Sequence, residues 1–150
     1  MKLTDAHFQT FKDQGFVVVE GFYPEEKRAA IAAAVRRTLP AWEAIKDDPP
    51  DPPLLKDDFP YADQFFNQLI VDWDIIKFVQ RILSTEDIHF RYAHNWARYP
   101  DPSGIEPKLH IDNGNNSLFP ANADNRYGQI STWYFPETVP ADQAPMRIIP

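Results

Sequence analysis

The sequence contains no cysteine among its 150 residues, which excludes a disulfide framework and a thiolate metal site. It contains only 5 glycines, and none of them forms a glycine-rich phosphate-binding loop. No apolar run has the length of a membrane-spanning helix, and the stretch from Met1 to Gln14 lacks the apolar core of a signal peptide. We therefore expect a soluble cytoplasmic protein with no membrane partner.

Basic residues are also in short supply, with 15 lysines and arginines against 22 aspartates and glutamates and a formal net charge of −7. Binding to a nucleic-acid backbone needs clustered basic side chains, so we expect no nucleic-acid partner. Lys27, Arg28, Arg36 and Arg37 do share one segment. We interpret that segment as the solvated face of a helix.

What is present is typical of one globular domain, since 43% of the residues are hydrophobic and 14% are aromatic. Thr4 is a suitable N-cap for a first helix, and Gly15 is placed to end it. The β-branched run 16–19 predicts a short buried strand. Pro24 suits the first position of a second helix, which Leu39 and the proline after it would end.

The middle of the chain is punctuated by proline. Residues 47–60 read DDPPDPPLLKDDFP, which predicts a loop and no regular element. The loop could serve as a substrate-side lid, although a plain solvated connection is the favoured interpretation. Two further helices are expected at 61–69 and 71–83, the second with an apolar stripe along one face.

Strands are expected after residue 84. Residues 87–99 alternate in the manner of a strand, with Ile88, Phe90, Tyr92, His94 and Trp96 on one face and His89, Arg91, Ala93, Asn95 and Ala97 on the other. A short strand at 107–112, a polar loop at 113–125 and a strand at 129–135 follow. Helices first and strands second is the α+β pattern, with a mainly β second half, and it differs from the alternation of a nucleotide-binding fold.

The motif that carries chemistry is His110-Ile111-Asp112. Because strand side chains alternate, His110 and Asp112 project from the same face and can coordinate one metal ion together. With a second histidine they would complete the two-histidine, one-carboxylate triad of non-haem Fe(II) oxygenases. Taken alone, the motif is better explained by a structural hydrogen bond between the two side chains.

The surrounding sequence resembles the phytanoyl-CoA dioxygenase family of Fe(II)- and 2-oxoglutarate-dependent oxygenases. The resemblance rests on FQTFKDQGFVVVEGFYPEEKRAAI at 8–31, LHID at 109–112 and STWYFPETVPADQAPMRIIP at 131–150. It implies a double-stranded β-helix, a jelly-roll of the cupin type, with N-terminal helices. The chain would then be a single incomplete domain at 1–150. Its helical part would span 1–84, with one short strand, and its first β-helix strands would span 85–150.

The resemblance also implies an activity. His110 and Asp112 would bind Fe(II), 2-oxoglutarate would be the co-substrate, and O2 would oxidise a C–H bond of a small-molecule substrate in a hydroxylase-type reaction that gives succinate and CO2. Four residues are expected near the co-substrate: Trp133, Asn95, His94 and Arg98. A core position for Trp133, and ordinary strand polarity for the other three, are the competing interpretations.

One departure from the family pattern matters. The family's second histidine ligand and its 2-oxoglutarate-binding arginine would be expected after Pro150, with the rest of the barrel. His89 or His94 could approach the metal in place of that second histidine, but the family offers no precedent for this. Without its third ligand, the chain could instead be a catalytically inactive β-helix binding module. The substrate and the oligomeric state are not indicated by the sequence.

Overall fold

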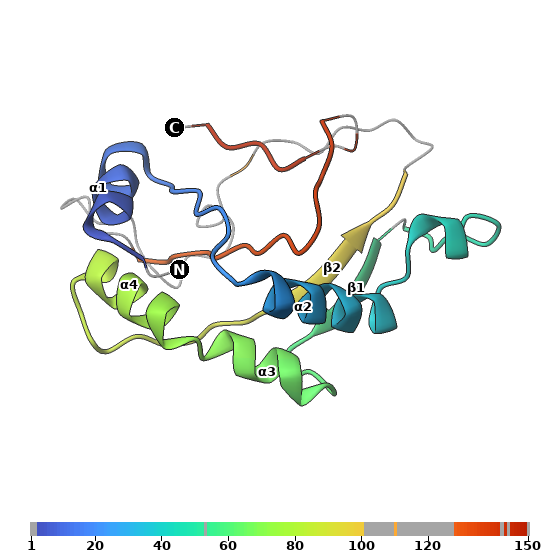
Figure 1. The fold of residues 1–150 in the computed structure, drawn as a ribbon, viewed down its shortest axis with the longest axis horizontal. Coiled ribbons are helices and arrows are strands. Elements are labelled where there is room, and N and C mark those ends of the chain that lie inside the picture. The colour runs from blue at the N-terminus through green and yellow to red at the C-terminus, as the bar shows by residue number, and fades with distance from the viewer. Residues whose placement is uncertain are drawn as a thin grey trace.

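The computed structural model describes residues 3–52, 54–100, 110, 128–141, 143 and 145–149. The elements in chain order are α1 (Asp5–Gln14), α2 (Glu25–Thr38), the short 3-10 helix η1 (Trp42–Ala44), β1 (Leu54–Asp58), α3 (Gln64–Ile70), α4 (Trp73–Leu83) and β2 (His94–Arg98). Helices α1 and α4 pack together at one end, while α2 and α3 lie beside the sheet of β1 and β2 (Figure 1).

Helix α1 begins and ends where the sequence predicts. The Thr4 hydroxyl accepts a hydrogen bond from the backbone N–H of His7, and Gly15 adopts the left-handed conformation that ends the helix. The helix packs on α4 through the rings of Phe8 and Phe78, whose centroids lie 6.5 Å apart. The guanidinium of Arg81 lies 3.9 Å from the centre of the Phe8 ring, which adds a cation–π contact between the helices.

Replacing Gly15 with alanine is expected to lower the free energy of unfolding by about 1 kcal/mol. The backbone φ angle of Gly15 is +79°, which side chains with a Cβ rarely adopt, and a Cβ placed there meets no atom within 4 Å. The cost is therefore conformational and not steric. Urea denaturation measures it, and Gly15→Asn should lose less, because asparagine tolerates this conformation. Equal losses for both variants would contradict this explanation.

The core forms between α2, α3 and the chain that enters β2. Its buried members are Ala34 of α2, Phe66 of α3 and Tyr61 in the turn before α3, and Ala93 packs against them. The Asn67 side chain accepts from the backbone N–H of Tyr61 at 3.0 Å and donates to its carbonyl at 2.8 Å. These two bonds hold the turn before α3 and fix Tyr61 in the core.

The sheet has one covered face and one open face. Strands β1 and β2 are antiparallel, with Leu54 opposite Arg98, Lys56 opposite Trp96 and Asp58 opposite His94. Ala93, just before β2, contacts the core, and buried Tyr99, just after it, donates a hydrogen bond to the Pro40 carbonyl at 2.7 Å. Odd-numbered positions of β2 therefore face the helices. Even-numbered positions face away from them.

Three predictions about elements are wrong. Residues 16–19 form no strand and Val18 is 70% exposed, because no strand of the described part of the chain pairs with them. Residues 47–60 include β1, because the prolines flank residues 54–58 and do not interrupt them. Residues 129–135 form no strand: their side chains contact neighbouring elements, but their backbone joins no described ladder.

Other predictions hold with changed bounds. The strand expected at 87–99 is confined to β2, because only that part faces β1. Pro24 is the N-cap of α2 and not its first residue.

The predicted strand at 107–112 lies outside the described residues except for His110, and so does the loop at 113–125. The double-stranded β-helix stays a prediction. Within the described ranges, no helix is long and apolar enough to cross a membrane.

Candidate functional site

The open face of the sheet carries a line of aromatic rings, which we call the aromatic row: Tyr92, His94, Trp96 and Trp133. The Tyr92 and His94 rings are stacked, with centroids 5.5 Å apart and an interplanar angle of 16°. His94 meets Trp96 edge to face at 5.1 Å. Trp96 then meets Trp133 at 5.5 Å and 39°. Rings from two separate segments thus form one continuous surface.

Much of this surface is accessible to solvent. The exposed fractions are 52% for Tyr92, 41% for Trp96 and 45% for Trp133. Phe90, 51% exposed, is a further exposed ring two residues before Tyr92, and it packs on Phe59 with the centroids 5.0 Å apart. A contiguous group of large exposed rings is uncommon on a soluble protein and marks a surface that binds something or is covered by something.

The same face carries charge. Lys56 lies opposite Trp96, and its ammonium nitrogen is 5.7 Å from the centre of the Trp96 ring. Arg98 is the next residue of β2 on this face, two positions beyond Trp96. Asp58 lies opposite His94, toward the Tyr92 end of the row. Lys56 and Arg98 therefore place positive charge beside and beyond Trp96, Asp58 places negative charge opposite His94, and the Arg91 guanidinium lies 5.3 Å from the centre of the Tyr92 ring.

Trp133 is held in place by helix α2. The Arg28 side chain donates a hydrogen bond to the Pro136 carbonyl at 2.9 Å, and Arg36 forms an ion pair with Glu137. Tyr134, the residue after Trp133, packs edge to face on Tyr23 with the ring centroids 5.2 Å apart. The basic residues of α2, interpreted from sequence as a solvated face, thus include two that fix the segment carrying Trp133.

Tyr23 connects this segment to the N-terminus of α4. Its hydroxyl donates a hydrogen bond to an Asp72 carboxylate oxygen at 3.0 Å, and the Lys27 ammonium lies 3.8 Å from the centre of its ring. Burial and, secondarily, the Asp72 charge raise the pKa of Tyr23. The phenol therefore stays protonated and keeps this link at neutral pH.

Three of the four residues predicted to line the co-substrate pocket share the open face. His94 and Trp133 belong to the aromatic row, and Arg98 lies beyond it on β2. Asn95 lies on the opposite face, which the helices cover, and its side-chain nitrogen is buried without a hydrogen-bond partner. Sequence reasoning missed Lys56 altogether, because its segment was predicted to be a loop.

The predicted metal ligands are described only in part. His110 is exposed, and Asp112 lies outside the described residues. Within the part of the chain that the structure describes, no three histidine, aspartate or glutamate side chains gather to hold a metal. His89 lies 3.6 Å from an Asp87 oxygen on an exposed stretch. The imidazole of His110 and the carboxylate of Asp112 are ligand types that suit Fe(II).

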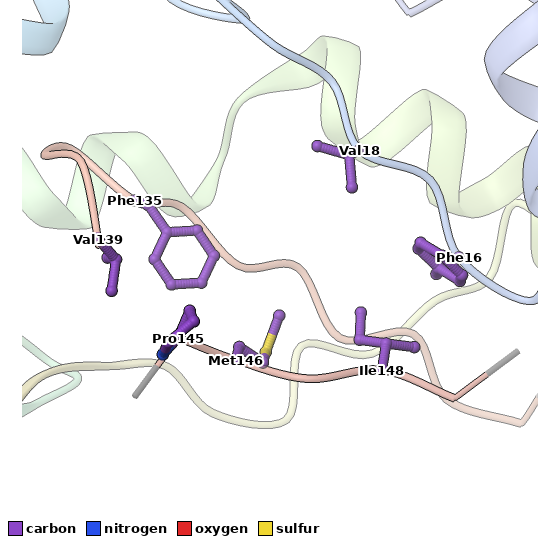
Figure 2. A pocket seen from close by; sticks show the side chains of 7 residues that line it. All are labelled: Phe16, Val18, Phe135, Val139, Pro145, Met146 and Ile148. Carbon is purple, nitrogen blue, oxygen red and sulfur yellow. The ribbon is translucent and has the colours of Figure 1, made fainter. Parts of the chain in front are cut away.

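A separate hollow of about 360 Å³ is lined entirely by apolar side chains. Figure 2 shows Phe16 and Val18 on one side of it and Phe135, Met146 and Ile148 on the other. With no charged or hydrogen-bonding side chain in its lining, the hollow offers no group for acid–base or metal chemistry.

Comparison with known protein families, with curated proteins and with solved structures finds no match to this chain.

Proposed function

We propose that the protein belongs to an Fe(II)- and 2-oxoglutarate-dependent oxygenase that oxidises a C–H bond of a small molecule. The observation that carries the proposal is the meeting of His94, Arg98 and Trp133 on one open face. The family resemblance led us to expect these residues near the co-substrate. His94 and Arg98 share the face because both are even-numbered positions of β2, whereas Trp133 reaches the same face from a distant segment of the chain.

The proposal includes the fold. In a double-stranded β-helix, one face of each sheet lines the interior and the other lies outside. Helices α2 and α3 cover the odd-numbered face of β2 through Ala93 and the core. The aromatic row would then line the interior. This arrangement accounts for aromatic side chains that are exposed in the described part of the chain.

Each residue has a proposed role. His110 and Asp112 would hold the metal, and Asp112 must be ionised to do so. When bound, iron supplies the activation of O2, and the protein supplies binding and orientation. The Arg98 guanidinium would line the co-substrate pocket and attract the anionic 2-oxoglutarate, in addition to the family's arginine expected after Pro150. His94 and Trp133 would form a wall that keeps water from the co-substrate.

Metal titration tests the proposal. In calorimetric titrations, the protein is expected to bind Fe(II) under anaerobic conditions and Mn(II) as a stable substitute for it. Loss of a direct ligand exceeds the roughly 10- to 100-fold effect of disturbing an outer partner. His110→Ala and Asp112→Ala should therefore each weaken binding by about 100-fold or more.

His7→Ala is the matched control, because it removes a histidine of helix α1, outside the sheet, and should leave the metal affinity unchanged. Equal affinities for the wild type and His110→Ala would overturn the proposal. The alternative, a catalytically inactive binding module, predicts no specific metal binding by any of these proteins.

A further inference from the structure

We propose that the aromatic row and Lys56 together bind a planar aromatic carboxylate. Calling this ligand the substrate rests on the proposed function, whereas its binding does not. The row offers rings for stacking, and Lys56 offers a cation beside the row. The family resemblance does not indicate this ligand. We infer it from the rings and the positive charge that share one open face.

The rings determine the planar part of the ligand. Trp96 and Trp133 meet at 39° and are both more than 40% exposed, so each keeps much of its surface free for another flat ring. Offset and edge-to-face contacts are the arrangements that aromatic pairs prefer. A flexible dicarboxylate such as 2-oxoglutarate has no ring and would leave most of this surface uncovered.

The charges determine the anionic part. Lys56 forms no ion pair with a carboxylate among the described residues, and its ammonium lies beside the Trp96 ring. Because the chain carries a net charge of −7, anions are attracted only where a cation is placed locally. Asp58, opposite His94, would repel a carboxylate beside that ring, and Arg91, whose guanidinium lies 5.3 Å from the centre of the Tyr92 ring, already donates a hydrogen bond to the Gln129 side chain. The ligand's carboxylate should therefore point toward Lys56.

Three small probes separate these contributions: 2-naphthoate, the neutral 2-naphthalenemethanol and the non-aromatic cyclohexanecarboxylate. Calorimetric titration should show 2-naphthoate binding about 10-fold or more tightly than either of the others, because only it has both ring and charge. Lys56→Gln should weaken 2-naphthoate by about 10-fold and leave 2-naphthalenemethanol unchanged. Trp96→Ala should weaken both ring compounds by about 10-fold.

Matched controls lie on helix α4. Lys77→Gln removes one exposed lysine, and Trp73→Ala removes a tryptophan that is 67% exposed; both should leave 2-naphthoate binding unchanged. Lys56 is itself exposed, so its variant does not depend on refolding of the core. Arg98→Gln should weaken 2-oxoglutarate and spare 2-naphthoate, which distinguishes the co-substrate position from the aromatic one.

The outcomes bear on the two proposals separately. Equal affinity for 2-naphthoate and 2-naphthalenemethanol, or equal losses in Lys56→Gln and Lys77→Gln, would overturn the aromatic carboxylate proposal. Metal binding that depends on His110 without any 2-naphthoate binding would overturn it as well and leave the oxygenase standing. Binding of 2-naphthoate that needs Trp96 and Lys56, without metal binding, would support the aromatic site and overturn the oxygenase.

Discussion

Replacing Phe66 with alanine is expected to lower the free energy of unfolding by about 3–5 kcal/mol, the usual cost of emptying a large aromatic position in a core. Phe66 is only 3% exposed and packs between Ala34 and Tyr61, whose ring centroid is 5.4 Å from its own. The core joins α2 and α3 to the chain entering the sheet. Guanidinium denaturation should therefore show loss of helix and sheet signals together.

Trp73→Ala is the control for this prediction, because it removes a larger ring that is 67% exposed. Its effect should stay within about 0.5 kcal/mol, as for most surface substitutions. A similar loss in Phe66→Ala and Trp73→Ala would show that the packing of α3 against α2 contributes little to stability. In thermal melts, the Phe66 variant should unfold roughly 10 °C lower.

The second large effect is a loss of stability in alkali. Burial, followed by the charges of Asp57 and Asp58, raises the pKa of Tyr61 from 10.0 to about 12. Below pH 10 the phenol is neutral in both folded and unfolded chains and contributes no pH dependence. Above pH 10 the unfolded chain releases its proton first, so stability falls as the pH rises toward 12. The loss due to Tyr61 should approach about 2 kcal/mol.

Tyr61→Phe isolates this contribution, because phenylalanine keeps the ring and removes the ionisable hydroxyl. Urea denaturation between pH 9 and pH 11.5, within the range set by these pKa values, should show a shallower fall for the variant than for the wild type. The pKa of Tyr23 is also raised, so Tyr23→Phe should flatten the curve further. Parallel curves for Tyr61→Phe and the wild type would mean that the Tyr61 hydroxyl is hydrated in the folded protein.

Local signals in the sequence predicted the helices well. Helix α1 begins at Thr4 and ends at Gly15, and α2 ends at Leu39, because these residues form hydrogen bonds with backbone groups a few residues away. A short stretch of sequence therefore contains what determines where each helix begins or ends. Strands depend on distant partners, and here the predictions failed. The run at 16–19 has strong β propensity but no partner strand among the residues that the structure describes. Strand β1 has aspartates and a lysine, and it pairs because β2 lies beside it.

The candidate site shows the same division. The alternation of residues 87–99 correctly placed His94 with Tyr92 and Trp96, and Asn95 on the other face. It could not reveal that Trp133 meets Trp96, because that contact depends on arginines of α2 anchoring a distant segment. Lys56 was missed for a related reason: a lysine between proline-rich stretches indicates a site only once its cross-strand neighbour is known.

The pairing of β1 with β2 also has a consequence for how the protein folds. Partners in this ladder, such as Asp58 and His94, are separated along the chain by two complete helices, α3 and α4. Closing a loop of that length carries an entropic cost before any ladder bond forms, whereas helices need only local contacts. We expect α3 and α4 to acquire helical structure first and the ladder to close late, which makes assembly of the aromatic row one of the slowest steps of folding.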